Sequence, residues 1–535
     1  MDGVNVRADI TEVLEIILTL KEAESLKELE RKSGVFGIKD KKLLRVLNEL
    51  IASNRVRTVG QSASTVYWQK DVREAYAKDY RMIFVHKADQ IAGYLFQNAQ
   101  EFVFCYADRY LTQSKVEIPG LPLDIVPYPS SELHAAFDEN LPEGVNREML
   151  EQSLNSSDEL DMLVRLTHNI GDIYFTLTGE SQVESQKNRP SFLSNLETIL
   201  GPALPFPAVL ENYTLDINEE ELFPEGEDLS HFTYDELPGI SGFQYKRLVD
   251  LDKEHHRIHQ DKSEGIRDFI LKPYSRYKAD PSSQYYLPHL ALNEHLFMSF
   301  AKNELGFRVP QSYLIKREND EEFHYLIKRF DRLGTYRFAK ANFSTYLGLR
   351  AENKYSTTSE KMFTRIKKEL ISEAERLELL KHYFYSMIIS HEDMHTKNLS
   401  LIISESIKLF APLYDIATTR IYSNTKHYDS HLTIDGQRSN ITPRHFEKLV
   451  DILDVNKKSF RSEAQRICEI FRDRLPEYIN AIEALGPLSF FTMKQKAKPG
   501  QAPTWVPNKE YELADVLRRY HEERINELVK LGWLK

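Results

Sequence analysis

Residues 391–398 of this chain read His391-Glu392-Asp393-Met394-His395-Thr396-Lys397-Asn398, and seventeen residues further on comes Asp415, within Leu413-Tyr414-Asp415-Ile416. Between them, residues 399–403 and 408–410 have the pattern of two short strands, so Asp415 is predicted to emerge from a hairpin beside Asp393 and Asn398. Two carboxylates and an amide oxygen would then meet at one strand edge. Magnesium prefers oxygen ligands of this kind.

The spacing His-x-Asp-x-x-x-x-Asn is the one found in the catalytic loop of protein kinases. There the aspartate accepts the proton of the attacking hydroxyl, and the asparagine binds a magnesium ion. The motif therefore favours phosphoryl transfer. The alternative is a helix end followed by a polar loop and a hairpin, with the carboxylates in solvent.

The composition is that of a globular protein with several domains. The chain has 535 residues, of which 41% are hydrophobic and 28% charged, and this length suggests three or more units. A formal net charge of -11 argues against general polyanion binding, so any nucleic-acid contact needs a local basic patch. Cys105 and Cys468 are too few and too far apart for a disulfide framework or a zinc site. No apolar run reaches the length of a membrane span, and we expect a cytoplasmic protein.

Residues 1–75 have the pattern of a winged helix. The elements predicted, in order, are a helix beginning at Thr11, helices over 25–32 and 40–52, and strands over 56–59 and 64–68. Three helices and a two-stranded wing in this order resemble the winged-helix module, whose third helix enters the DNA major groove.

The region from 39 to 58 is locally basic. Its six basic residues outnumber Asp40 and Glu49; they are Lys39, Lys41, Lys42, Arg45, Arg55 and Arg57. Because lysine and arginine supply most of the affinity for the DNA backbone, we predict contacts to operator DNA through Lys39, Lys41, Lys42, Arg45 and Arg57. The alternative is a protein-interaction or dimerisation module with a solvated basic face.

Residues 76–178 are predicted to form a small antiparallel sheet and helices without a catalytic constellation. Strands are expected over 82–85, 91–96 and 101–106, with Gly93 at a turn or bulge. Residues 179–238 are rich in acids and prolines, and we interpret them as an acidic linker or insertion.

An ATP-binding segment is predicted between residues 239 and 332. The small-residue loop from Gly239 to Lys246 would let backbone amides approach phosphates, and a following strand delivers Lys272. A helix from about 289 to 303 carries Glu294, which can pair with Lys272 as in kinases. Two further strands end at residues 328–332, where a kinase hinge offers backbone groups to adenine.

These stretches together resemble the HipA family of serine/threonine protein kinases, the toxins of bacterial toxin–antitoxin systems. The resemblance covers about residues 80–480, and its matching stretches are 141–144, 239–246, 270–273, 293–294, 305–310, 329–332, 393–398, 413–416, 431–432 and 444–446. It implies an α+β, two-lobed protein-kinase-like fold, here with an N-terminal winged helix.

The resemblance assigns roles to individual residues of this chain. Asp393 would be the catalytic base, His395 would line the phosphate site, and Asn398 and Asp415 would hold Mg²⁺. The residues implied in ATP binding are Ser241, Gly242, Gln244, Lys246, Lys272, Lys328, Phe330 and Asp331. Ser241 would also be the autophosphorylation site, since it is the only serine of the loop.

Two residues depart from the family pattern. Met394 stands where the family has glycine, which is expected to crowd the substrate side, and Lys328 replaces an acid at the hinge. The implied partners are a protein substrate such as an aminoacyl-tRNA synthetase, an antitoxin and operator DNA.

The remaining residues are predicted to be mostly helical. A helix over 375–390 leads into the catalytic loop, helices fill 442–484, and a linker over 494–507 joins a last helix over 511–531 that would clasp another domain or a second subunit of a homodimer. The predicted domains are 1–75, 76–178, 179–238, 239–332, 333–490 and 491–535.

The sequence leaves a second function open. A winged-helix transcriptional regulator with a nucleotide-sensing, catalytically weak kinase domain would carry the same residues. A small-molecule phosphotransferase on a related fold is a third hypothesis.

Overall fold

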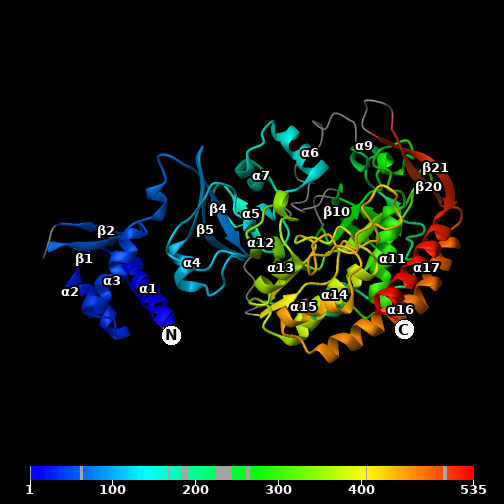
Figure 1. Cartoon of the computed structure of the whole chain (residues 1–535). Coiled ribbons are helices and arrows are strands. Elements are labelled where there is room, and N and C mark those ends of the chain that lie inside the picture. The colour runs from blue at the N-terminus through cyan, green and yellow to red at the C-terminus, as the bar shows by residue number, and fades with distance from the viewer. Residues whose placement is uncertain are drawn as a thin grey trace. The chain divides into compact units, whose positions relative to one another are not determined.

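The computed structural model describes residues 2–60, 64–166, 169–181, 189–224, 244–260, 266–404, 407–497 and 503–535, with the backbone alone for residues 2–7. The chain forms two compact units. Unit 1 comprises residues 1–138, 158–166 and 172–187, and unit 2 comprises residues 139–157, 167–171 and 188–535. Figure 1 shows the elements of both units along the chain.

Unit 1 begins with a helical module. Its elements are α1 (Asp2–Thr19), β1 (Glu24–Ser25), α2 (Leu26–Ser33), α3 (Asp40–Ala52), β2 (Val56–Val59) and β3 (Val66–Gln69). The strands form an antiparallel sheet in the order β1-β3-β2. The apolar faces of α1 and α3 are buried around Leu14, Ile17 and Leu47. The element order is the one predicted, and the assignment to the winged-helix class remains a prediction.

Two details of this module concern its helix ends. The Oγ of Ser25 accepts a hydrogen bond from the Glu28 amide, so Ser25 caps α2. The first helix begins at Asp2 and not at Thr11. The prediction was wrong because it started the helix at its first capping residue, whereas the polar residues before Thr11 are also helical.

Arg55 does not belong to the exposed basic surface that the charge count suggested. Its side chain is fully buried and forms an ion pair with Asp108. The guanidinium also donates to the carbonyl oxygens of Ile125, at 3.1 Å, and Tyr106, at 3.0 Å. The planar, five-donor guanidinium suits this buried role, which holds α4 (Asp108–Gln113) and residue 125 against the helical module.

The second part of unit 1 is a five-stranded antiparallel sheet in the order β7-β6-β5-β4-β8. The strands are β4 (Arg81–Lys87), β5 (Gln90–Gln97), β6 (Phe102–Tyr106), β7 (Tyr128–Ser130) and β8 (Ile173–Thr176), and the helices α5 (Ala135–Asp138) and α7 (Glu159–Arg165) accompany them. The three predicted strands are thereby confirmed.

Gly93 lies at a bulge in this sheet. The pairing of β4 with β5 shifts by one residue after Val85, which pairs with Gly93. A Cβ atom on Gly93 would lie 2.3 Å from the carbonyl oxygen of Cys105 on β6. Glycine is required here because the neighbouring strand comes too close for any side chain.

Unit 2 contains a small lobe built on a six-stranded sheet in the order β13-β14-β12-β10-β11-β9. Its strands are β9 (Thr214–Leu215), β10 (Arg247–Asp252), β11 (Arg257–His259), β12 (Phe269–Lys272), β13 (Ser312–Ile315) and β14 (His324–Lys328). Its helices are α6 (Gly144–Leu154), α8 (Leu196–Leu200), α9 (Glu219–Leu222), α10 (Arg276–Ala279) and α11 (Leu290–Asn303). The predicted order of strand, lysine, helix and two further strands is confirmed.

Of the two interpretations of residues 179–238, an acidic linker or an insertion, the linker was wrong for residues 189–224, and the insertion stays a prediction. Strand β9 pairs in parallel with β11 and completes the small-lobe sheet. Leu215 and Leu222 are buried in the sheet core, and Phe192 is buried in a separate cluster. Among the described acids of this segment, Glu219 and Glu220 are exposed and Glu221 is half-buried.

The large lobe is mostly helical. Its elements are β15 (Arg332–Leu333), β16 (Tyr336–Arg337), β17 (Ala339–Asn342), α12 (Phe343–Leu347), α13 (Ser359–Ile366), α14 (Glu373–Ile388), β18 (Ser400–Ser404), β19 (Ile407–Phe410), α15 (Pro443–Leu453), α16 (Lys457–Glu483) and α17 (Leu513–Leu531). The hairpin β18–β19 after the catalytic loop is as predicted, and β17 adds a third strand. One hydrophobic core joins these helices to α11 of the small lobe.

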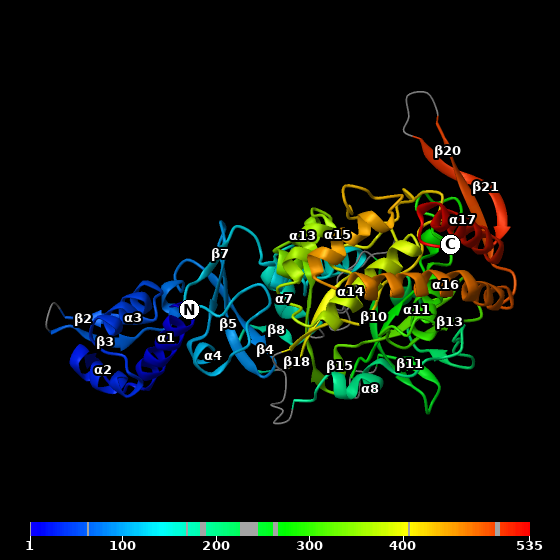
Figure 2. The same ribbon diagram turned by 60° about the horizontal axis from the view of Figure 1, so that its bottom comes forward.

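The C-terminal segment differs from its prediction in one respect. Residues 489–512 contain a long antiparallel hairpin of β20 (Ser489–Lys496) and β21 (Thr504–Glu512), visible in Figure 2, where a linker was expected. Its lysines and prolines suggested a linker because they are common in exposed, unpaired chain. Helix α17 packs on its own large lobe, where Tyr520 donates to the carbonyl oxygen of Ile389 and Arg524 to that of Ile388.

Within the described residues, no helix combines the length and the apolar character that crossing a membrane requires.

The close approach at Gly93 gives a stability prediction. Gly93→Ala should lower the thermal unfolding midpoint of the chain by at least about 2–4 °C, because overpacking of this kind costs about 1–3 kcal/mol. The control is Gly34→Ala, where φ is -59° and the added Cβ meets only the Lys39 Cε, at 3.3 Å. Equal midpoints for the two variants would contradict the requirement for glycine at the bulge.

Candidate functional site

The catalytic-loop motif follows the buried helix α14 directly. At the end of this helix Ser390 has a φ of +53°, which turns the chain into the loop. The Nδ1 of His391 lies 2.7 Å from the carbonyl oxygen of Ala417, so the loop is tied to the segment after Asp415. The Nδ2 of Asn398 donates to the carbonyl oxygen of Asp393 at 2.9 Å. These bonds close the loop on itself and leave the amide oxygen of Asn398 as the atom a cation would contact.

Lys272 joins the two lobes of the site. Its Nζ lies 2.7 and 2.8 Å from the two carboxylate oxygens of Glu294 and 2.6 Å from Oδ1 of Asp415. The predicted Lys272–Glu294 pair is therefore formed. Burial disfavours the ammonium, but the carboxylates of Asp415 and Glu294 outweigh it and raise the pKa of Lys272.

Asp415 has an unusual backbone as well as an unusual charge environment. Its φ is +56°, a left-handed conformation that non-glycine residues adopt at a cost and that is concentrated at functional sites. Burial opposes ionisation, but Lys272 and Lys246 hold the pKa of Asp415 well below its ordinary range. The carboxylate is therefore charged and positioned at any physiological pH.

Lys246 is a second cation near Asp415. Its side chain is buried, and its backbone amide donates to Oδ1 of Asn146 on α6 at 3.1 Å. Burial lowers the pKa of Lys246 to about 8, although the charge of Asp415 opposes that change. Two lysines thus converge on the polar end of the site.

These side chains line one cavity of about 540 Å³. Its polar lining includes Lys246, Lys272, Asp393, His395, Asn398 and Asp415, and its apolar lining includes Ile270, Leu287, Leu290, Ile327, Phe330 and Ile416. The structure therefore brings together the predicted residues from the catalytic loop, the strand lysine and the second aspartate. An elongated ligand with an anionic end and a flat apolar end suits such a cavity.

The predicted hinge is present, but several of its polar groups are engaged within the protein. The amide of Lys328 donates to the carbonyl oxygen of Gln311 and its Nζ to that of Thr198, at 2.8 and 2.7 Å. The Arg329 amide donates to the carbonyl oxygen of Asp268. Adenine contacts through these two amides would therefore require breaking existing bonds; the hinge prediction concerned the backbone of residues 328–330 as a whole and stays a prediction.

The carboxylate of Asp331 is also engaged, although the residue lines the cavity as predicted. It accepts hydrogen bonds from the guanidinium groups of Arg329 and Arg332 and from the Gly171 amide, all between 2.8 and 2.9 Å. Burial opposes ionisation, but the two arginines keep the pKa of Asp331 well below its ordinary range. Its role in this structure is to hold the wall of the cavity.

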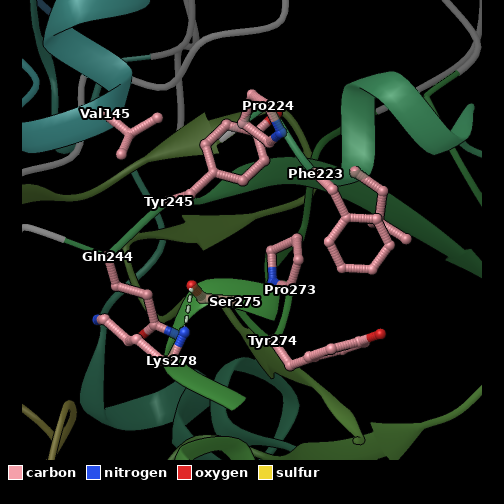
Figure 3. A pocket seen from close by; sticks show the side chains of 10 residues that line it. Val145, Phe223, Pro224, Gln244, Tyr245, Pro273, Tyr274, Ser275 and Lys278 are labelled. Carbon is pink, nitrogen blue, oxygen red and sulfur yellow. Dashed lines mark hydrogen bonds between the residues drawn. The ribbon is translucent and has the colours of Figure 1, made fainter. Parts of the chain in front are cut away.

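The glycine-containing loop lies largely outside the described residues. Ser241 and Gly242 belong to that part, so their predicted contacts with ATP remain predictions. Gln244 lines the main cavity, as predicted, and also a neighbouring cavity of about 40 Å³ beside Pro273 and Tyr245. Figure 3 shows this smaller space, which is too small for a nucleotide.

Met394 does not crowd the substrate side, so that expectation was wrong. Its side chain is buried in the large-lobe core. It is not among the residues that line the cavity. The neighbouring His395 is buried at the cavity wall, where burial lowers the pKa of its imidazole to about 4, so the ring is neutral near pH 7.

Several site residues were missed by sequence reasoning. Glu143, at the start of α6, accepts from Lys397 at 2.6 Å and from Lys354 at 2.9 Å. Tyr355 donates from its hydroxyl to Oδ1 of Asp393. The stretch 141–144 carried a family signal, but no local pattern indicated that it reaches the catalytic loop, 254 residues away in sequence.

The geometry defines a kinase-like α+β fold with one charged cavity between a sheet lobe and a helical lobe. Comparison with known families then identifies the relatives. The model of the HipA-like C-terminal domain matches residues 239–477, and that of the HipA N-terminal domain matches residues 83–175. The chain therefore belongs to the HipA-like family.

Individual relatives are more distant. The putative kinase Y4dM of Sinorhizobium fredii is 29% identical over 153 residues, which are 26% of this chain and 37% of that protein. Thus the chain matches little more than a third of this relative's length. The structure of the Shewanella oneidensis MR-1 toxin–antitoxin complex of HipA, HipB and operator DNA contains a chain that matches with a TM-score of 0.54 and 18% identity, over 84% of this chain and 98% of that one. The proinflammatory kinase CtkA of Helicobacter pylori matches with a TM-score of 0.32 and 14% identity, over 50% and 86%.

The Glu143 pairs predict how stability depends on pH. Burial favours the neutral acid, but Lys397 and Lys354 lower the pKa of Glu143 from 4.5 to about 2. A carboxyl group whose pKa is lower in the folded state than in the unfolded state stabilises the fold at pH values above its unfolded-state pKa. This stabilisation is lost as the pH falls toward the folded-state pKa. Glu143→Gln should therefore cost on the order of 3 kcal/mol at pH 7, and the difference from wild type should vanish between about pH 4.5 and 2.

Denaturant unfolding across this pH range measures the effect. The control is Glu151→Gln on the same helix, whose surface pair with Arg147 is about one-third exposed and should contribute less than about 1 kcal/mol. A cost that is equal for the two variants, or independent of pH, would contradict the assignment.

Proposed function

We propose that this chain is an ATP- and Mg²⁺-dependent serine/threonine protein kinase. The observation that carries the proposal is the convergence of Asp393, Asn398 and Asp415 with the Lys272–Glu294 pair in one cavity. These groups match in type and in chain order the parts that phosphoryl transfer uses. Membership of the HipA-like family and the description of one relative as a putative kinase support it.

The residues present fit a magnesium nucleotide. Mg²⁺ is usually held by one or two protein oxygen ligands together with phosphates and water, and Asn398 and Asp415 supply an amide oxygen and a charged carboxylate. Lys246 and Lys272 suit phosphates, and the apolar walls at Ile270 and Ile327 suit a purine.

Bound ATP would supply the transferable phosphoryl group, and the metal would neutralise charge on it. The side chains of this chain would position the nucleotide and take the proton from the attacking hydroxyl. Asp393, whose side chain is 55% exposed, is accessible to an incoming hydroxyl and accepts its proton. Glu294 orients the Lys272 ammonium, and the neutral ring of His395 lies beside Asp393, with its Nε2 4.0 Å from Oδ1.

The finer parts of the proposal come from the family resemblance. By it, the substrate is a serine or threonine of a translation component such as an aminoacyl-tRNA synthetase, an antitoxin neutralises the chain, and Ser241 is autophosphorylated. The solved HipA relative is in complex with HipB and operator DNA, which supports antitoxin and DNA as partners to test.

The proposal predicts the behaviour of a conservative variant of the base. Asp393→Asn should lower the rate of phosphate transfer from labelled ATP by roughly 100- to 10,000-fold, because the amide cannot accept the proton. Removal of Mg²⁺ with a chelator should abolish transfer in the wild type. Transfer is measured to the chain itself and to proteins of a cytosolic extract.

The matched control is Asp473→Asn, an exposed aspartate on α16 that pairs with Arg472. Unchanged transfer in Asp393→Asn would overturn the assignment of the base. Tight ATP binding without any transfer in the wild type would favour the alternative, a transcriptional regulator with a nucleotide-sensing kinase domain.

A second activity, DNA binding by the N-terminal module, is favoured by the exposure of its basic residues. The side chains of Lys39, Lys41, Lys42, Arg45 and Arg57 are all exposed. Lys42 pairs with Asp9 at 2.8 Å, so its charge is partly neutralised. Exposed apolar side chains on the same module, Val35, Phe36 and Val59, are the observation that favours the alternative of a protein-interaction module.

Salt titration of binding to a mixed-sequence DNA duplex separates these alternatives. Replacing Lys41 and Arg45 together by alanine should reduce the slope of log K against log salt by about 0.9 for each DNA phosphate that these two side chains neutralise. Lys457→Ala, an exposed lysine on α16, is the control and should leave the slope unchanged. No binding by the wild type at low salt would remove the DNA proposal.

A further inference from the structure

Tyr355 occupies the position that a phosphate acceptor would take. It lies just after the short 3₁₀ helix at residues 351–353, and its hydroxyl donates to Oδ1 of Asp393 at 2.5 Å. The catalytic base of a kinase accepts a hydrogen bond from the hydroxyl to be phosphorylated. The chain therefore presents one of its own hydroxyl groups to its candidate base.

The Tyr355 ring is held from more than one side. It packs against the His431 ring, with centroids 4.1 Å apart, and edge-on against the His395 ring at 5.0 Å. All three side chains line the main cavity. These contacts fix the ring plane, so the direction of the hydroxyl toward Asp393 is set by packing as well as by its hydrogen bond.

The backbone of this segment is attached to the catalytic loop itself. Lys354 forms an ion pair with Glu143, and its carbonyl oxygen accepts a hydrogen bond from the Oγ1 of Thr396 at 2.9 Å. Thr396 belongs to the catalytic-loop motif. Tyr355 is therefore anchored by its neighbour in sequence to the same loop that carries Asp393.

The other tyrosines that line the cavity are engaged differently. The hydroxyl of Tyr414 donates to the carbonyl oxygen of Lys397 at 2.8 Å, and that of Tyr422 to the carbonyl oxygen of Pro288 at 3.1 Å. Both bonds satisfy main-chain acceptors, as buried tyrosines commonly do. Among the tyrosines lining the cavity in the described ranges, Tyr355 alone donates to the base.

We propose that Tyr355 is a phosphate acceptor of this chain's own site, modified in cis. This inference rests on the proposed kinase function. The Oη–P bond forms, the bond between the γ-phosphorus and the β,γ-bridging oxygen of ATP breaks, ADP leaves, and the hydroxyl proton passes to Asp393. Because the fold positions this hydroxyl, a preference for serine and threonine in external substrates does not apply to it.

The ionisation of Tyr355 agrees with this geometry. Burial, followed by the nearby charge of Asp393, raises the pKa of the Tyr355 phenol, so the hydroxyl keeps its proton and donates to the carboxylate. After transfer, a phosphate of nearly two negative charges would stand beside Asp393. Repulsion would then displace the side chain and free the base for an external substrate.

Phosphosite mapping of the full chain tests the proposal. After incubation with ATP and Mg²⁺, the wild type should carry at least roughly tenfold more phosphate on Tyr355 than on Tyr285, because positioning beside a base outweighs exposure. Tyr285 is the control for accessibility, since it is 62% exposed. Tyr355→Phe should lose this phosphate, and Asp393→Asn should lose it together with the others.

A mixture of unlabelled wild type with heavy-isotope-labelled Asp393→Asn separates cis from trans transfer. Phosphate on Tyr355 of the heavy chain would overturn modification in cis. Phosphate on other residues of the wild type but none on Tyr355 would overturn this inference and leave the kinase proposal standing. No transfer to any residue of the chain or to extract proteins would overturn both.

A measurement without nucleotide tests the hydrogen bond independently of activity. N-acetylimidazole acetylates accessible tyrosine hydroxyls, and mass spectrometry locates the product. Asp393→Ala should increase acetylation of Tyr355 roughly fivefold, because the variant removes a hydrogen bond to a charged group, and should leave Tyr285 unchanged. Equal rates at Tyr355 in the wild type and the variant would show that the base does not hold the hydroxyl, which would overturn the proposal.

Discussion

One lysine ammonium connects the parts of the site that come from different lobes. Lys272 on β12 contacts Glu294 on α11 and Asp415 after the β18–β19 hairpin, all within 2.8 Å. Buried charges cost several kcal/mol unless each is paired, so the buried Lys272 and Glu294 depend on each other, and the half-buried Asp415 gives Lys272 a second partner. The packing of the small-lobe strand, its helix and the large-lobe hairpin is therefore coupled to the electrostatics of the cavity.

Two further charge networks extend this organisation around the cavity. Glu143 at the start of α6 draws Lys354 and Lys397 together, and Lys397 belongs to the catalytic loop. In the segment 329–332, Asp331 forms ion pairs with Arg329 and Arg332. Glu143 joins lysines from two separate segments, whereas Asp331 pairs with arginines of its own segment, so the cavity wall is held by ion pairs as well as by the hydrophobic core.

This arrangement also explains why the carboxylate of Asp393 is both accessible and hydrogen-bonded. The ion pairs of Lys272 hold Lys272 and Asp415 in place, whereas the side chain of Asp393 remains more than half exposed. An exposed carboxylate at the mouth of a charged cavity attracts a hydroxyl donor, and Tyr355 supplies one from the segment that Glu143 anchors through Lys354. The hydrogen bond that Asp393 accepts thus depends on the segment of Lys354 and Tyr355.

By itself, the sequence determined the local elements and the chemistry of the central motif. The bounds of α3, the hairpin after the catalytic loop and the Lys272–Glu294 pair followed from periodicity, capping and chain order. Only the tertiary structure decided which residues are buried. Arg55 and Met394 are buried, although the sequence suggested a basic surface for one and the substrate side for the other. Residues 189–224 and the hairpin β20–β21 are structured. A local sequence pattern depends on a few neighbouring residues, whereas burial and ion pairing depend on segments that meet only after folding. Glu143 and Tyr355, which contact the loop of residues 391–398 from distant parts of the chain, are examples.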